Sequence, residues 1–401
     1  MVRRREFIAS AAVAPLLSAA PGRKKIACLS STYHVRSHSD NFITRFLEGY
    51  WIMDKYHEPP FDVASLYMDQ IHPADIGGKL SQAYGFPIHK TIADALTLGT
   101  GKLAVDGVIL ICEHGQFPHN EKNQQLYPRY EYYEQVVKVF QDSKRSCPVF
   151  VDKHLSYDWK KAKQMYDWSR QLKFPLMAGS SVSVTFRRPA LDIPLNSDLE
   201  GAVSVGGGWV ADGGLFHILE ALQALTERRK GGEVGVRSVQ LLKDDQVWKG
   251  AQEGLWRRDL LDAALAAAEK VEPGRPEDVK RPVACVVEYR DGFRAAAIAL
   301  GGKVSEYLVA VKRKSEPKPE AAVCYIPSEN SNNFSMLVHG ITEMISTGKR
   351  PYAVERTLLT TGALSFLMES GHQNGKKIET PELKIAYKSP AKSYFAPGVG
   401  S

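Results

Sequence analysis

Polar and ionisable side chains stand directly after the apolar, strand-like runs in the first half of this sequence, where they could do chemistry. They are Ser30, Ser31, Thr32 and His34 after residues 25–29, Asp69 after 63–68, Glu113 and His114 after 107–112, and Asp152 and Lys153 after 148–151. Ligands of open parallel α/β sheets bind at the carboxyl ends of the strands. We therefore expect these side chains to line one pocket. The alternative is that Asp69, His114 or Lys153 is an ordinary solvated residue at the end of a strand.

The loop after the first run lacks the glycines of a dinucleotide-binding fold. Such a fold places three glycines there, for a tight turn, for the approach of the backbone to pyrophosphate and for helix packing. Those positions hold roughly Ser30, Thr32 and Val35. Their hydroxyls can bind phosphate, but a side chain obstructs the approach that glycine permits. The loop alone does not predict a nucleotide. Asp69 could bond ribose hydroxyls, although it lies further along than the usual ~20 residues.

Histidines and cysteines are the residues that could bind a metal. His34, His38 and Asp40 are close in sequence, but Asp40 also suits the N-cap of a helix that begins at Asn41. The five cysteines are widely spaced and show no metal-ligand spacing. We predict no metal site and interpret the cysteines as buried, inert thiols.

The elements that position the candidate residues alternate between strand and helix. Helical stretches are predicted at residues 41–56, 76–85, 91–99 and 130–144, between and after the apolar runs. Alternation of this kind predicts a parallel sheet covered on both faces. The fold class is therefore α/β, with a Rossmann-like doubly wound domain over residues 23–180.

The second half changes character. A helix is predicted at 215–229, and strands at 235–242, 283–290, 294–300 and 307–311, with Asp291-Gly292 as a hairpin turn. Trp256, Leu260, Leu261 and Leu265 suit the core face of another helix. Residues 181–387 are predicted to form a C-terminal α+β domain with an open, mainly antiparallel sheet and helices on one face. A helix at 354–370 closes it, and 388–401 form a loose tail.

The N-terminus and the charge pattern bear on location and partners. Residues 1–22 run from arginines through an apolar stretch to small residues, and Arg4-Arg5 followed by Glu6-Phe7-Ile8 resembles a twin-arginine signal. This predicts export to the periplasm; the alternative is the basic N-terminus of a cytoplasmic protein. No apolar run approaches 18 residues, so no membrane span is expected. The net charge is +7, and the run 228–230 precedes Gly231-Gly232 as a solvated helix end would, so no nucleic-acid partner is expected.

Several later stretches, in the right order, resemble the Gfo/Idh/MocA oxidoreductases, the family of glucose-fructose oxidoreductase and inositol dehydrogenase. The stretches are 106–112 with His114 and His119, 148–156 with Asp152-Lys153, 177–179, Arg187-Arg188-Pro189, 206–208 with Asp212, Gly214 and His217, and 352–381. The resemblance covers nearly all of the chain after residue 22.

The resemblance implies roles for individual residues. Lys153 would contact the substrate hydroxyl, where a cation lowers the cost of developing alkoxide charge. His217 would be the acid/base group, with Asp212 as its companion carboxylate. Arg187, Arg188 and Glu220 would bind substrate. NAD or NADP would be the cofactor, a carbohydrate the substrate, and the C-terminal sheet a surface for homo-oligomers.

The sequence also departs from the family pattern. His154 replaces a proline after Lys153, and Asp212 precedes His217 by five residues instead of four, whereas Glu220 keeps an acid on the face of that helix. The leading hypothesis is an exported NAD(P)-dependent sugar or polyol dehydrogenase. The alternatives on the same fold are a non-redox carbohydrate lyase or hydrolase, and a sugar-binding protein.

Overall fold

The computed structural model describes residues 22–206, 212–327 and 331–396 of the 401-residue chain. The predicted export signal falls almost entirely outside these residues, as do Gly207 and Gly208 of the glycine-rich stretch. Within the described ranges, no helix has the length and apolarity needed to span a bilayer.

The first half folds around a six-stranded parallel sheet, as predicted. In spatial order the strands are β5 (Ile88–His89), β4 (Phe61–Met68), β1 (Lys24–Ser30), β6 (Gly107–Ile111), β7 (Val149–Asp152) and β8 (Leu176–Gly179). Every pairing between these strands is parallel. Strands β6, β7 and β8 are buried at each position because helices cover both faces, which explains their uninterrupted apolar runs.

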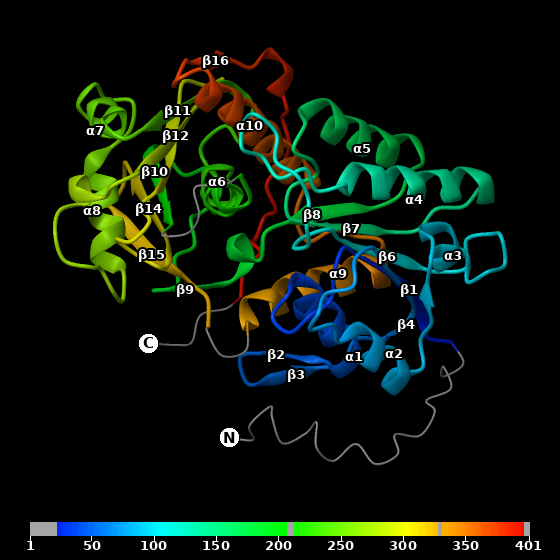
Figure 1. Ribbon diagram of the computed structural model, residues 1–401. Coiled ribbons are helices and arrows are strands. Elements are labelled where there is room, and N and C mark those ends of the chain that lie inside the picture. Colours follow the sequence, from blue (N-terminus) through cyan, green and yellow to red (C-terminus); the bar gives the residue numbers. More distant parts are fainter. Residues whose placement is uncertain (1–21, 207–211, 328–330, 397–401) are drawn as a thin grey trace.

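Helices from two distant parts of the chain cover this sheet (Figure 1). One face packs against α3 (Ile92–Thr97), α4 (Arg129–Ser143) and α5 (Trp159–Gln171). The other packs against η2 (Asp40–Thr44), α1 (Arg45–Glu48) and α9 (Ser335–Thr347), and α2 (Gly77–Tyr84) lies at its margin. Because α9 comes in sequence after seven of the eight strands of the second sheet, the chain returns to the first sheet. The division at residue 180 therefore does not separate two continuous segments.

The helix predicted over residues 41–56 is wrong in its second half. It ends at Glu48, and Gly49 takes a φ of 78° before the hairpin of β2 (Tyr50–Ile52) and β3 (Lys55–His57). A Cβ at Gly49 would come within 2.8 Å of His57 O, so this turn requires glycine. The apolar pattern extends past the helix because Tyr50 and Ile52 also face the core.

The second half builds an eight-stranded mixed sheet. In spatial order the strands are β16 (Ile378–Glu379), β11 (Val236–Lys243), β12 (Val283–Tyr289), β13 (Arg294–Ala299), β10 (Leu199–Gly206), β14 (Tyr307–Arg313), β15 (Glu320–Tyr325) and β9 (Phe186–Arg188). Among its described strand pairs, β10 and β13 alone are parallel. The Asp291-Gly292 turn joins β12 to β13, with Gly292 at a φ of 87°. The mainly antiparallel sheet is confirmed.

Both faces of this second sheet are covered, which corrects the prediction of helices on one face. On one face lie α6 (Asp212–Thr226) and α10 (Val354–His372), with α6 between the two sheets (Figure 1). On the other lie α7 (Asp245–Gln252) and α8 (Arg258–Ala267), which connect β11 to β12. Trp256 and Leu260 join this second core, as the predicted helix face requires. The apolar side chains on this face are buried within the chain, and a homo-oligomer through the C-terminal sheet stays a prediction.

Arg228 and Arg229 of the basic run are packed, as is the C-terminal segment, whereas Lys230 is exposed. This corrects the predicted loose tail and, for the two arginines, the predicted solvated helix end. Arg228 is 3% exposed and donates to the carbonyl oxygens of Pro390 and Ala391 at 2.8 and 3.1 Å. Further along, Tyr394 donates to Met336 O at 3.0 Å. The segment up to residue 396 therefore fastens α6 to α9.

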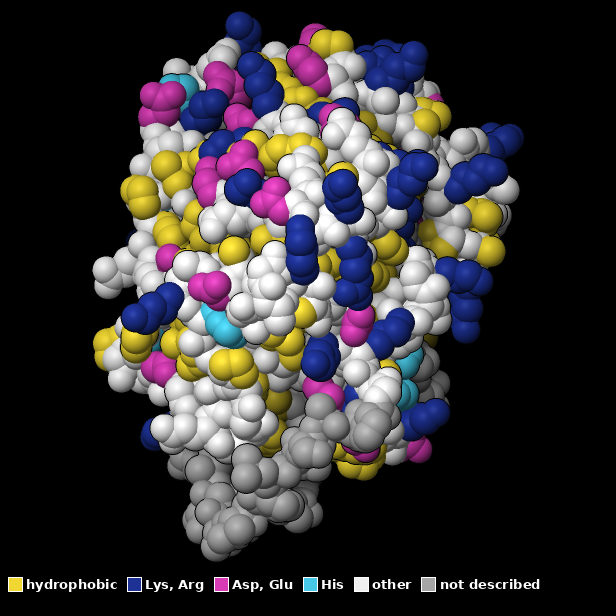
Figure 2. Space-filling model, turned by 90° about the vertical axis from the view of Figure 1, so that its right-hand side faces the viewer, with side chains coloured by type: hydrophobic (Ala, Val, Ile, Leu, Met, Phe, Trp, Pro, Cys, Tyr) yellow, Lys and Arg dark blue, Asp and Glu magenta, His cyan; other side chains and the backbone are white. Residues whose placement is uncertain are grey.

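Lysine and arginine side chains lie scattered among acidic and uncharged ones on the face shown in Figure 2. The net charge of +7 is thus spread over this face instead of forming one continuous basic patch there.

Candidate active site

A buried charge cluster occupies the carboxyl ends of β6 and β7. Glu113, just after β6, accepts from Lys153 Nζ at 2.7 Å through Oε1 and from Arg129 Nη2 at 2.5 Å through Oε2. Burial acts to raise the pKa of Glu113, but the Lys153 and Arg129 cations outweigh it and hold that pKa well below its usual range. Glu113 is therefore a permanent counter-ion. Arg129, the first residue of α4, was not among the predicted site residues.

Lys153 and His114 are held in left-handed backbone conformations. Their φ angles are 63° and 66°, which β-carbons disfavour and which cluster at functional sites. The Lys153 N–H donates to Gly179 O at 3.1 Å, so β8 fixes the bend after β7. The bend turns the lysine away from the strand and toward α6, where Nζ lies 3.5 Å from the place of a Cβ on Gly213.

Asp152 lies at the same edge of the parallel sheet as Lys153 but contacts the loop after β1 instead of approaching α6. Its Oδ2 lies 2.6 Å from His38 Nδ1, a contact that joins β7 to the loop after β1. His38 was weighed from sequence as a metal ligand, yet its partner is this carboxylate. Among the described residues, no group of three or more His, Cys, Asp or Glu could hold a metal ion.

His217 reaches the cluster from α6. Its Nδ1 lies 2.5 Å from Ser180 Oγ, and its ring meets the Tyr307 ring edge to face at 5.7 Å between centroids. Burial, reinforced by the Lys153 ammonium, lowers the pKa of His217 well below its ordinary value. The imidazole is consequently neutral at pH 7. The structure thus brings Lys153 and His217 together, as the resemblance implied.

Ser180 was missed from sequence although a signal was present. It directly follows β8, as the other candidates follow their strands. Besides contacting His217, its N–H donates to Glu220 Oε2, so one residue connects the histidine to the carboxyl one helical turn away.

Glu220 is a buried positioning group, which corrects its predicted role in substrate binding. It is 0% exposed, and its Oε1 lies 2.5 Å from Thr357 Oγ1 on α10. Burial raises the pKa of Glu220 to about 7. The Thr357 hydroxyl also lies 2.9 Å from Ala178 O, so a protonated Glu220 can donate to Thr357 while Thr357 donates to Ala178.

Asp212 begins α6, and its Oδ1 accepts from the Gly213 N–H at 2.8 Å. Its Oδ2 is buried without a partner, and burial raises the pKa of Asp212. No hydrogen bond in the described part of the chain joins it to His217. The five-residue spacing explains this, since the two residues lie more than a helical turn apart.

Arg187 and Arg188 lie on β9, at the far edge of the second sheet. Arg187 is buried and donates to Leu191 O at 2.8 Å, and Arg188 stacks on Tyr325 at 3.5 Å and pairs with Glu269. These contacts are structural and do not join the cluster around Lys153, which corrects their predicted role in substrate binding.

The loop after β1 is closed by its own contacts. Ser30 Oγ lies 2.5 Å from Ser39 Oγ, and Ser31 Oγ donates to Glu113 O at 2.7 Å. These two hydroxyls, predicted to bind a cofactor, are therefore already engaged. The His34 ring lies against His72 at 4.2 Å and near His114 at 5.6 Å between centroids.

A bridge joins the loops after β4 and β6 across the end of β1. The Gln116 N–H donates to Gln70 Oε1 at 2.8 Å, and Gln70 Nε2 donates back to Gln116 O at 3.1 Å. Asp69, one residue before Gln70, is exposed at the end of β4, next to β1, where the sequence placed it. Neither partner of this bridge was predicted.

Three polar groups at this edge fit the polar parts of a dinucleotide. Thr32 Oγ1 and His114 Nε2 are buried without a hydrogen-bond partner, and Asp69 presents an exposed carboxylate whose Oδ1 accepts from the Tyr67 hydroxyl at 3.1 Å. Burial lowers the pKa of His114 to about 4, so its ring is neutral and can donate one N–H. A hydroxyl and an imidazole N–H can donate to phosphate, and a carboxylate can accept from ribose hydroxyls.

No family model matches the sequence, and no curated protein matches it. Among solved structures, GenD2 from gentamicin A biosynthesis, in complex with NAD, is similar over 92% of this chain and 99% of its own, with a TM-score of 0.57 and 11% identity. The chain has this fold.

Two further structures agree. Scyllo-inositol dehydrogenase from Lactobacillus casei is 11% identical with a TM-score of 0.54, covering 89% of this chain and 98% of its own. A myo-inositol dehydrogenase from Corynebacterium glutamicum is 10% identical with a TM-score of 0.53, also covering 89% and 98%. The architecture expected from the resemblance is confirmed over both sheets.

Proposed function

We propose that this protein is an oxidoreductase that transfers a hydride between NAD or NADP and a hydroxyl-bearing carbon of a sugar or polyol. The observation that carries the proposal is the neutral His217 beside the Lys153 ammonium, at the carboxyl edge of a parallel sheet. The fold shared with GenD2 and two inositol dehydrogenases supports it, as do the unpartnered polar atoms of Thr32 and His114 and the exposed carboxylate of Asp69.

The side chains divide the work of alcohol oxidation. When His217 Nδ1–H donates to Ser180 Oγ, Nε2 keeps a free lone pair and takes the substrate hydroxyl proton. The Lys153 ammonium stabilises the negative charge that develops on the alkoxide oxygen. Glu113 and Arg129 hold that lysine in place. The nicotinamide, when bound, supplies the hydride acceptor.

Nucleotide content tests the proposal most directly. Protein purified without heating is denatured, and the released small molecules are analysed by mass spectrometry; the emptied protein is titrated with NAD and NADP by calorimetry. We expect one of the two to be released or bound. If neither is, the dehydrogenase is excluded.

A matched pair of histidine variants then tests the site. His217→Gln should lower turnover at least about 10²-fold while nucleotide binding persists. His339→Gln, whose ring contacts Tyr50 away from the cluster, should leave turnover unchanged. Equal losses in the two variants would contradict the assignment of His217.

The closed loop after β1 favours a second candidate, a non-redox acid/base reaction on a carbohydrate in the same pocket. The hydroxyls of Ser30 and Ser31 are engaged, and a dinucleotide lying across β1 has to part the Gln70–Gln116 bridge. Gln70→Ala removes the bridge. Under the dehydrogenase proposal this variant binds nucleotide several-fold more tightly, whereas under the second candidate neither parent nor variant binds it.

Export to the periplasm is also proposed, on the Arg4-Arg5 pattern and the apolar stretch that follows it. Replacing both arginines by lysine should retain the chain in the cytoplasm if the twin-arginine route carries it. Unchanged fractionation of that variant would refute this route.

A further inference from the structure

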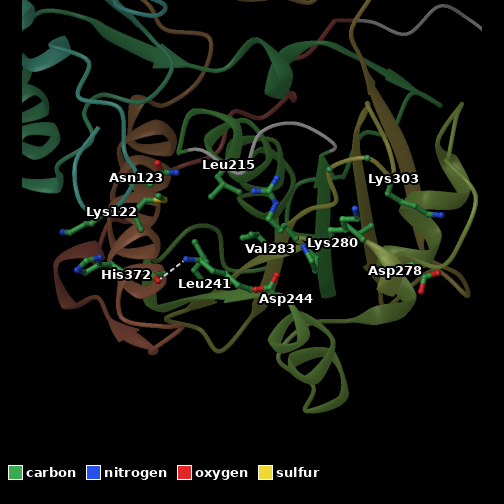
Figure 3. A pocket seen from close by; sticks show the side chains of 18 of the residues that line it. Lys122, Asn123, Leu215, Leu241, Asp244, Asp278, Lys280, Val283, Lys303 and His372 are labelled. Carbon is green, nitrogen blue, oxygen red and sulfur yellow. Dashed lines mark hydrogen bonds between the residues drawn. The ribbon is translucent and has the colours of Figure 1, made fainter. Parts of the chain in front are cut away.

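A broad hollow of ≈ 1210 Å³, shown in Figure 3, is lined by none of the residues of the candidate active site. Its walls are the end of α10, the end of β11, the start of β12, the turn at 301–303, the loop at 273–279 and the loop at 119–123. Leu215 of α6 lines it, whereas His217, two residues further, faces Ser180. Because positions two apart point to nearly opposite sides of a helix, α6 separates the hollow from the His217 site.

The hollow carries an excess of positive charge. Six lysines and arginines line it against three acids, with His119 and His372 in addition. The cations are Lys122, Lys243, Arg275, Lys280, Arg281 and Lys303, and the acids are Glu121, Asp244 and Asp278.

Four of these six cations are already engaged, among them Lys243, which donates to Gly371 O at 3.2 Å. Lys122 pairs with Glu369 at 2.5 Å, Arg275 pairs with Asp278 at 3.1 Å, and Lys303 donates to Gly274 O at 2.5 Å. Lys280 and Arg281, adjacent at the start of β12, are exposed and have no ion pair with any described residue. Their charges are free to meet an anion.

The remaining walls suit a ring compound better than a bare ion. Leu215, Leu241, Val283 and Met368 give the hollow an apolar floor. Gly301 and Gly302 line one side with backbone instead of side chains. A pyranose ring has apolar C–H faces and a polar rim, so it matches a floor of this kind beneath cationic walls.

We propose that this hollow binds an anionic oligosaccharide, with its carboxylate or sulfate groups against Lys280 and Arg281 and its ring faces over the Leu215–Val283 floor. The volume exceeds the roughly 300–1,000 Å³ typical of pockets for a single small molecule, so several rings fit. The site is separate from the proposed hydride transfer, and its loop at 119–123 follows β6 and Glu113 in the chain.

The test uses the whole protein and three probes in calorimetry at low and high salt. Tetragalacturonate carries carboxylates, a carrageenan tetrasaccharide carries sulfates, and the methyl ester of tetragalacturonate is the uncharged match of the first. We expect one charged probe to bind, salt to weaken its binding, and the ester to bind at least about tenfold more weakly.

Charge-reversal variants locate the site. Lys280→Glu with Arg281→Glu should weaken binding of the charged probe at least about tenfold, whereas Lys79→Glu with Lys90→Glu, an equal charge change on the first domain, should not. Lys280→Gln with Arg281→Gln serves if the reversal unfolds the chain, as judged by circular dichroism. The proposal is overturned if neither charged probe binds, if the ester binds equally well, if inorganic sulfate binds as tightly as the charged probe, or if both variant pairs behave alike. Nucleotide content is independent of all four outcomes.

Discussion

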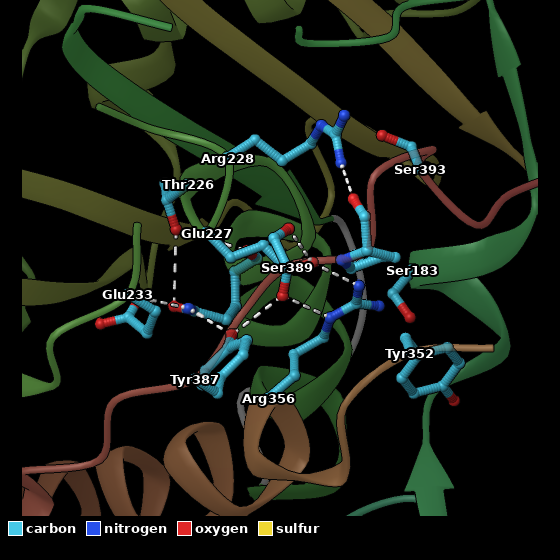
Figure 4. A network of polar contacts seen from close by, with 12 residues as sticks. Ser183, Thr226, Glu227, Arg228, Glu233, Tyr352, Arg356, Tyr387, Ser389 and Ser393 are labelled. Carbon is cyan, nitrogen blue, oxygen red and sulfur yellow. Dashed lines mark hydrogen bonds and ion pairs between the residues drawn. The ribbon is translucent and has the colours of Figure 1, made fainter. Parts of the chain in front are cut away.

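Two buried charge networks lie in this molecule, and they differ in how completely their groups are bonded. One surrounds Glu227, which lies beside the C-terminal segment at Tyr387 and Ser389 (Figure 4). Arg356 reaches Glu227 through Nη2 at 2.6 Å and Nε at 2.8 Å, and Tyr387 and Ser389 each donate to the same carboxylate at 2.9 Å. In the described structure this carboxylate accepts four hydrogen bonds, and Arg356 Nη1 is the one group left without a partner.

The other network surrounds Glu113 at the edge of the parallel sheet. Lys153 and Arg129 satisfy the carboxylate, but groups beside it are orphaned: Thr32 Oγ1, His114 Nε2, His154 Nδ1 and Asp212 Oδ2. A buried polar atom without a partner costs about 1–3 kcal/mol. Several orphans in one place are therefore costly unless a ligand completes them. The comparison indicates that the Glu227 network stabilises the fold and that a bound ligand completes the hydrogen bonds of the Glu113 network.

The largest expected effect on stability comes from a substitution that breaks the Glu227 network. Arg356→Ala leaves Glu227 as a buried charge without its cation, and we expect a loss of about 3–5 kcal/mol in the free energy of unfolding. Urea unfolding followed by fluorescence measures it. Arg237→Ala, on an exposed arginine, should cost less than about 0.5 kcal/mol. A small loss in the Arg356 variant would show that the Glu227 network does not hold the fold.

The matching change in the Glu113 network should lower turnover more than it lowers stability. Lys153→Met removes the cation proposed to face the alkoxide, while Arg129 still neutralises Glu113. We expect turnover to fall by about 10²–10³ and unfolding free energy to change less than in the Arg356 variant. Steady-state kinetics and urea unfolding are compared on one preparation. A stability loss as large as that of Arg356→Ala would make Lys153 a structural cation.

Glu220, which links α6 to α10, gives a pH-dependent prediction. Its folded pKa of about 7 lies above the unfolded value, so the proton stabilises the fold at low pH and this contribution is lost as the pH rises through 7. Glu220→Gln mimics the protonated form and should lack this decline. Between pH 4 and 8 we expect its stability relative to the parent to rise by about 3 kcal/mol. Glu253→Gln, on an exposed acid, should show no such trend.

The smallest expected changes in stability have opposite signs in the two networks. Ser389→Ala removes a bonded hydroxyl from the Glu227 network and should cost about 1 kcal/mol, whereas Thr32→Val removes an orphaned hydroxyl and should gain about as much. Thermal unfolding of both variants measures the two shifts. The Thr32 variant should also bind nucleotide more weakly. Destabilisation by Thr32→Val would mean that its hydroxyl is satisfied in the protein without a ligand.

Local sequence patterns were sufficient to predict the parallel sheet and part of the candidate active site. Strands buried on both faces leave continuous apolar runs, and polar residues after them mark the carboxyl edge, which is how Glu113, Asp152 and Lys153 were found. The same rule applied to β8 would have found Ser180. The periodic apolar residues of α9 could likewise have predicted a helix at 335–347.

Other features depend on contacts between distant segments. Nothing around Arg129 shows that it is buried against Glu113, because its partner stands sixteen residues earlier in a separate element. The roles expected for Glu220, Arg187 and Arg188 were wrong for the same reason, since packing by α10 and β15 decides what they face. The packing of α9 on the first sheet and of α8 on the second is likewise invisible to periodicity, which gives a helix its apolar side but not its target.

The connection from β11 to β12 makes the second sheet's outer cover part of the same chain. A cover tethered in this way has an effective local concentration that dilution does not change. An assembly of separate subunits would instead lose its cover as the concentration falls. The packing of α7 and α8 on the second sheet should therefore be the same at nanomolar and micromolar protein concentration.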